Sequence, residues 1–169
     1  MFEPLLQSNE IYTHKDLTIQ PFIIECDGNG KFVRTYDSSR SALHARGDRV
    51  DIYSLFQFVD VGSGIVKLYS LRHRSFLSAI GVGWPLFPRV EDEDWSRFQV
   101  HINSDGTINL SSTHPLAKDG PFISVISESR ILRVAEREPR KEWSYFRLYD
   151  VQTYLRELDA FVTDSTYKA

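Results

Sequence analysis

The chain has 169 residues, of which 41% are hydrophobic and 25% charged, and this balance excludes an intrinsically disordered protein. The net charge of −3 argues against nucleic-acid binding, because domains that bind nucleic acid usually carry a basic surplus. The single cysteine, Cys26, excludes an intramolecular disulfide framework, and we expect a buried, unreactive thiol there.

The N-terminal residues carry neither a basic start nor a sustained apolar run, so the sequence predicts no signal peptide. No stretch approaches the roughly 20 apolar residues that a membrane-spanning helix needs. We therefore expect a cytoplasmic protein with no membrane span. Residues 1–18 fit no regular pattern, and we interpret them as an N-terminal arm that lies over the domain or is partly disordered.

Short apolar runs separated by glycine-rich or charged turns predict strands throughout residues 19–150. They fall into three groups of four: 21–26, 31–36, 42–46 and 50–59; 65–71, 75–80, 86–90 and 95–102; 107–112, 122–126, 131–135 and 143–150. Each group ends with an aromatic residue, a phenylalanine three positions later and another apolar residue two positions after that. The three copies of this ending are "IYSLFQFV", "DWSRFQVH" and "EWSYFRLY".

The apolar positions of the three groups keep a common register. The closing phenylalanines are Phe56, Phe98 and Phe146, at intervals of 42 and 48 residues. The other matched positions are Ile24, Leu68 and Leu110 in the first strands, Phe32, Phe76 and Phe122 in the second, and Leu43, Leu86 and Leu132 in the third. Such matches indicate an internal repeat whose apolar residues form a core. The expected fold is all-β, with twelve strands in three repeats.

After Asp150 the apolar spacing changes from that of a strand to that of a helix. Residues 151–162 are predicted to form a short amphipathic helix with Asp150 as its N-cap, and a polar tail completes the segment 151–169. The helix could dock on the domain's own surface, bind a partner or lead into a second domain.

Twelve strands in three units of this length resemble a β-trefoil, in which six strands close a barrel and six form hairpins that cap one end. The motif "FLSA" after a basic turn and the repeat ends "WSRF" and "WSYF" resemble the fascin-type trefoil. The stretch from "SDGTINLSS" to "EWSYFRLYDV" resembles the amaranthin-type agglutinin domain. The ricin type is a poorer match, because its Gln-x-Trp signature does not occur.

These resemblances cover residues 19–150 and imply different functions. An amaranthin-type agglutinin is implied to bind carbohydrate, often near a subunit interface, so a homodimer is one expected assembly. A fascin-type domain is implied to bind actin, usually as a tandem array. Only one such domain is present here, which weakens the actin interpretation, because bundling needs two filament contacts.

Candidate binding residues lie where the three copies differ. Trp84 stands in the glycine-rich loop "GVGWP", where an exposed ring could stack on a sugar; alternatively, it caps the barrel or packs under the arm. Arg72 and His73 occupy the turn between the first two strands of the second repeat, and His114 and Asp119 occupy the corresponding turn of the third. These turn residues could bind hydroxyl groups, or they are ordinary solvated loop residues.

The remaining motifs carry little functional information. The tripeptide "RGD" at 46–48 is best explained as a tight turn, and the acidic run at 91–94 as a solvated connection. The sequence lacks a Gly-x-Ser-x-Gly elbow, a phosphate-binding glycine loop and a His-Glu-x-x-His motif. We therefore expect no catalysis, no metal site and no cofactor.

The expected function is that of a non-catalytic, lectin-like β-trefoil module that binds a glycan or protein ligand through surface loops, and no nucleic acid. Two alternatives stay open at this point. One is a fascin-like actin-binding or structural interaction protein, and the other is a trefoil protease inhibitor.

Overall fold

The computed structural model describes residues 2–6, 17–18, 20–36, 42–79, 81, 83–89 and 94–151. The predicted C-terminal helix and tail lie outside the described residues except for Val151, which is buried. No helix in these ranges is long and apolar enough to cross a membrane.

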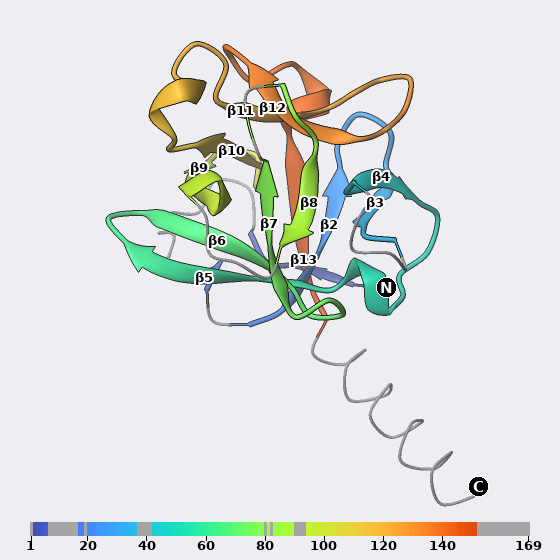
Figure 1. The fold of residues 1–169 in the computed structure, drawn as a ribbon. Helices are drawn as coiled ribbons and strands as arrows, with labels where there is room; N and C mark the ends of the chain where they lie inside the picture. Colours follow the sequence, from blue (N-terminus) through green and yellow to red (C-terminus); the bar gives the residue numbers. More distant parts are fainter. Residues whose placement is uncertain are drawn as a thin grey trace, which may run out of the picture.

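Six strands form a closed barrel (Figure 1). They are the first and last strands of the three repeats: β2 (Phe22–Cys26), β5 (Phe56–Gly62), β6 (Ile65–Ser70), β9 (Arg97–Ile102), β10 (Ile108–Ser112) and β13 (Phe146–Asp150). Neighbouring strands pair in the order β13-β10-β9-β6-β5-β2, and β2 pairs again with β13, which closes the ring. A closed ring leaves the barrel without an open sheet edge.

The other strands of the repeats form three hairpins: β3 (Phe32–Arg34) with β4 (His44–Gly47), β7 (Ser75–Ala79) with β8 (Leu86–Arg89), and β11 (Phe122–Val125) with β12 (Leu132–Glu136). The hairpins are also joined to one another. The Leu43 N–H donates to the Leu86 carbonyl at 2.8 Å, and the Leu132 N–H donates to the Leu43 carbonyl at 3.0 Å. A six-stranded barrel with three hairpins, built from three repeats, is a β-trefoil. The predicted twelve-strand fold is confirmed.

The core repeats as the sequence register predicts. All three closing phenylalanines, the three matched first-strand residues and the three matched third-strand leucines are buried: Phe56, Phe98, Phe146, Ile24, Leu68, Leu110, Leu43, Leu86 and Leu132. These side chains belong to one hydrophobic cluster. Burial of a side chain of this size contributes about 1.5–3 kcal/mol, so each repeat adds several such contributions to the stability of the core.

Two details of the predicted strands are wrong. The aromatic residue that precedes each closing strand is not part of the strand, because it lies in a 3-10 turn: η2 (Ile52–Ser54), η3 (Asp94–Ser96) or η5 (Glu142–Ser144). In addition, Phe32, Phe76 and Phe122 are only half-buried. Successive side chains of a strand face opposite sides, and the next residues, Val33, Leu77 and Ile123, are the ones that fill the core.

The N-terminal arm contributes a thirteenth strand, β1 (Glu3–Pro4). It pairs antiparallel with the end of β13, with Glu3 opposite Asp150 and Pro4 opposite Tyr149. The Leu5 N–H continues the ladder to the Leu148 carbonyl at 2.9 Å. Of the other described arm residues, Leu6 and Leu17 are buried, so part of the arm belongs to the core.

Candidate functional site

The turn between β6 and β7 packs on a tyrosine of the preceding repeat. His73 donates its Nε2–H to the Tyr36 carbonyl at 2.7 Å, and its ring centre lies 6.2 Å from that of Tyr53. The guanidinium carbon of Arg72 lies 5.5 Å from the centre of the same Tyr53 ring, within range of a cation–π contact. Both predicted binding residues of this turn therefore help to hold it on η2.

The equivalent turn of the third repeat, between β10 and β11, packs on Trp95. The His114 ring stacks on the indole with a centre-to-centre distance of 4.0 Å and an interplanar angle of 7°. Its Nδ1 accepts a hydrogen bond from the Leu116 N–H at 3.1 Å, which caps the short helix η4 (Pro115–Ala117). His114 is therefore held by structural contacts, while Asp119 is exposed on the same turn.

The five candidate residues do not form one site. Arg72 and His73 contact Tyr53 of the first repeat, whereas His114 contacts Trp95 of the second repeat. The two turns occupy equivalent places in the fold, and each has its own aromatic partner. Trp84 lies elsewhere, on the loop between β7 and β8.

Trp84 is the most exposed of the three tryptophans, with 53% of its surface open to solvent, whereas Trp95 is buried and Trp143 packs against the core. The backbone beside it is braced. The Gly83 N–H donates to the Val134 carbonyl of β12 at 2.8 Å, and the Trp84 N–H donates to the Gly81 carbonyl at 3.2 Å. A Cβ atom on Gly81 would lie 3.1 Å from the indole Cδ1, so the bare glycine lets the ring rest on the backbone.

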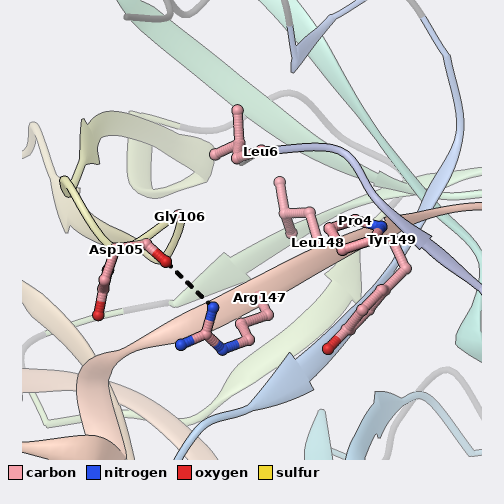
Figure 2. Close-up of a pocket in the computed structure, with 7 residues that line it drawn as sticks. All are labelled: Pro4, Leu6, Asp105, Gly106, Arg147, Leu148 and Tyr149. Carbon is pink, nitrogen blue, oxygen red and sulfur yellow. Dashed lines mark hydrogen bonds between the residues drawn. The ribbon is translucent and has the colours of Figure 1, made fainter. Parts of the chain in front are cut away.

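Two pockets lie beside the N-terminal arm, and the sequence did not predict them. The smaller arm pocket, of about 160 Å³, is shown in Figure 2 and is lined by Pro4, Leu6, Asp105, Gly106, Arg147, Leu148 and Tyr149. The larger arm pocket, of about 390 Å³, is lined by Phe2, Pro4, Glu25, Phe32 and Tyr149. Pro4 and Tyr149 line both, so the pairing of β1 with β13 places one pocket beside the other.

Polar side chains connect the walls of these pockets. Arg147 donates from Nε to the Asp27 carboxylate at 3.3 Å and from its terminal nitrogen to the Asp105 carbonyl at 3.2 Å, the latter drawn in Figure 2. The Tyr149 hydroxyl donates to Glu25 Oε1 at 3.2 Å. These bonds tie β13 to β2 and to the turn between β9 and β10.

These contacts determine the protonation states of Tyr149 and Asp105. Burial, and then the nearby Glu25 carboxylate, raise the pKa of Tyr149 above its usual value, so the phenol stays a neutral donor at physiological pH. The Asp105 carboxyl accepts a hydrogen bond from the Thr107 hydroxyl at 2.6 Å, which lowers its pKa, and the Arg147 charge acts in the same direction. Asp105 is therefore ionised.

The sequence did not predict the arm pockets because they are lined by outward-facing residues of β13. Arg147 and Tyr149 alternate with the buried Phe146 and Leu148. A signal was present, since the outward positions of the closing strands differ between repeats: Gln57 and Val59, Gln99 and His101, Arg147 and Tyr149. The pairing of Glu3–Pro4 with β13, which completes both pockets, leaves no periodic signal in so short a segment.

The described part of the chain contains no cluster of three or more His, Cys, Asp or Glu side chains that could hold a metal ion. In the acidic run, residues 91–93 lie outside the described ranges, and Asp94 bonds to Arg97 at 3.3 Å. Asp48 of the "RGD" tripeptide forms an ion pair with Lys31. The Cys26 thiol is buried, and burial raises its pKa, so it is a poor nucleophile as predicted.

A solved structure with a similar fold is a designed threefold symmetric protein, ThreeFoil. It superposes with a TM-score of 0.67 at 15% sequence identity, and the match covers 77% of this chain and 98% of ThreeFoil. The fold is shared. An identity this low carries no information about a ligand. No protein-family model and no curated protein matches the chain.

Proposed function

We propose that the protein is a non-catalytic, lectin-like binding module that takes a carbohydrate on the exposed face of Trp84. The observation that carries the proposal is the 53% exposure of this indole ring on a braced loop. Sugar rings present C–H faces that stack on aromatic side chains, and tryptophan offers the largest such surface.

The surroundings of Trp84 support this assignment. The Trp84 ring does not belong to the hydrophobic core that the three repeats share, so it has no structural role in that core. Burying half an indole against a ligand would also recover hydrophobic free energy that the folded protein leaves unused. Because hydrogen bonds hold both Gly83 and Trp84, little conformational entropy would be lost on binding.

A glycan array with the purified chain tests this proposal, followed by titration of any positive glycan with tryptophan fluorescence as the signal. Trp84→Ala should abolish binding, and Trp84→Phe should retain part of it. Leu116→Ala is the matched control, because Leu116 is 71% exposed on a different loop, and it should bind as the unaltered chain does. The absence of any glycan signal, or signals that persist in Trp84→Ala, would contradict sugar binding at this ring.

A second candidate, protein binding of the fascin-like kind, is favoured by the hairpin of β5 and β6. Its tip exposes Val59 and Val61, with 38% and 42% of their surfaces open. The two-residue turn at Ser63 and Gly64 has positive φ at both positions, which is the tight type I′ geometry. An actin co-sedimentation assay tests this candidate, with Val61→Lys as the variant that should lose pelleting. Light scattering on the same sample reports whether the chain forms a homodimer.

A further inference from the structure

We propose that the larger arm pocket is a binding site for a small alkylammonium cation. This site is separate from the Trp84 surface, and its ligand is of a different chemical class. Four elements supply its walls: Phe2 and Pro4 come from the arm, Glu25 from β2, Phe32 from β3 and Tyr149 from β13. Its volume of about 390 Å³ lies within the usual range of small-molecule pockets, about 300–1,000 Å³.

Three aromatic rings form the apolar walls. Phe2, Phe32 and Tyr149 are each half-buried, and all three pack against the buried cluster of Ile23, Leu55 and Val151. The cluster holds the rings from behind and leaves part of each ring facing the pocket. Rings arranged around a space in this way attract an organic cation through their quadrupoles, and each such contact contributes about 0.5–2 kcal/mol.

Glu25 supplies the charge that distinguishes a cation from a neutral apolar ligand. Its carboxylate is held at the pocket wall by the Tyr149 hydroxyl, which donates to Oε1 at 3.2 Å. The hydrogen bond also fixes the Tyr149 ring relative to the carboxylate. A hydrocarbon ligand would strip water from this carboxylate without replacing the lost solvation, whereas an alkylammonium group would offset the loss.

The charge of the lining also favours a cation. Among the described residues that line the pocket, Glu25 is the one with an ionisable acidic or basic side chain of full charge. Two basic residues adjacent in sequence or strand to lining residues are paired with carboxyl or carbonyl groups: Arg147 bonds to Asp27 and to the Asp105 carbonyl, and Lys31, next to Phe32, pairs with Asp48. An anionic ligand would be repelled here, and a cation would be attracted.

Titration of the full chain with choline, followed by NMR, tests the proposal. The matched neutral probe is 3,3-dimethylbutan-1-ol, which has the same shape without the charge. Choline should bind saturably and at least about fivefold more tightly than the alcohol. A peptide with trimethyllysine forms a parallel arm, because it shares the cationic group; binding of both probes indicates a general alkylammonium site, and binding of one identifies the source. Equal binding of choline and the alcohol, or no saturable choline binding, would overturn the proposal.

Two substitutions assign the binding to this pocket. Phe32→Leu keeps an apolar side chain but removes the aromatic face, and it should weaken choline binding about threefold or more. Its control is Phe76→Leu, because Phe76 is the half-buried equivalent in the second repeat and does not line the pocket. Glu25→Gln should reduce choline affinity and should raise alcohol affinity, because the neutral amide costs less to desolvate than the carboxylate. Equal effects of the two leucine variants would place the cation elsewhere, and Trp84→Ala should change none of these values.

Discussion

The three repeats share one contact between neighbours, yet each builds it from different side chains. The turn after the first strand of a repeat packs on the aromatic residue that closes the preceding repeat. In the second repeat this turn presents His73 to Tyr53, and in the third it presents His114 to Trp95. In the first repeat it presents Gly28 to Trp143, and a Cβ at this glycine would lie 3.1 Å from the Trp143 ring.

This difference shows that variation between repeats is not by itself a sign of function. In the third repeat the His114 ring stacks on Trp95, whereas in the first repeat the Trp143 ring packs directly on the backbone of Gly28. The side chains differ because each must complete a contact with a different aromatic partner. Features without a counterpart in the other repeats, such as Trp84 and the arm pockets, are therefore better candidates for ligand binding than the turns.

The largest expected effect is a difference in the free energy of unfolding between substitutions in the repeated core and at half-buried positions. Phe98→Ala should lower the free energy of unfolding by about 3–5 kcal/mol, because the side chain is completely buried in the barrel. Phe76→Ala, at a half-buried position of the same repeat, should cost about 1–2 kcal/mol. Urea unfolding followed by circular dichroism measures both, and equal losses would refute the inward and outward assignment.

His44 should make stability depend on pH, because it is a buried histidine. It follows Leu43, the third-strand leucine of the first repeat, and only in this repeat is the residue at that position buried. Burial, and then the charge of Arg34, lower the pKa of His44 to about 4 from 6.5. Protonation therefore favours the unfolded chain, so stability present above pH 6.5 is lost as the pH falls toward 4. The expected loss between pH 7.5 and pH 5 is roughly 2 kcal/mol.

Urea unfolding of the unaltered chain and of His44→Gln at both pH values measures this loss. The variant cannot titrate at this position, so its stability should fall by about 2 kcal/mol less over the same interval. An identical pH dependence in both proteins would show that His44 does not titrate as proposed.

His114 of the third repeat has two roles, the stack on Trp95 and the cap of η4, and two substitutions separate them. His114→Ala removes both the stack on Trp95 and the cap of η4, and it should destabilise the fold by about 1–2 kcal/mol. His114→Asn keeps a capping acceptor and should recover part of that loss. Thermal unfolding compares the two variants, and if they are equally stable the cap contributes nothing.

The smallest expected effect is a gain in stability. Arg74 adopts a φ of 52°, whereas Gly30 adopts the similar φ of 65° at the equivalent turn of the first repeat. Both residues donate their N–H to the last residue of the preceding strand at 2.9 Å. Because a left-handed conformation strains a residue with a Cβ, Arg74→Gly should stabilise the protein by about 1 kcal/mol. Calorimetry would detect this as a raised melting temperature, and a lowered one would contradict it.

The fold could be predicted from the sequence because its core repeats. Phe56, Phe98 and Phe146 recur at a nearly constant interval, and a buried position in one repeat implies buried positions in the others. Local details were less accessible. Tyr53, Trp95 and Trp143 each stand three residues before a closing phenylalanine and lie in a 3-10 turn. The apolar pattern alone does not reveal the buried serine that follows each of them.

The candidate sites were only partly predictable for a different reason. Trp84 was recognised because it interrupts the repeat in a glycine-rich loop, and the structure leaves it exposed. The arm pockets depend on contacts between the two ends of the described chain, such as that of Tyr149 with Glu25. Residues so far apart in the sequence produce no local pattern that joins them.

The pairing of β2 with β13 has a consequence for synthesis of the chain. The barrel closes only when its first strand, β2, meets its last, β13, and the residues paired between them include Glu25 with Arg147 and Ile23 with Tyr149. A contact between such distant residues forms late and slowly, because a long loop must close first. While the ribosome synthesises the second and third repeats, the edge of β2 that pairs with β13 in the folded protein has no partner strand. The nascent protein is therefore most exposed to misassembly or aggregation until residue 150 has emerged.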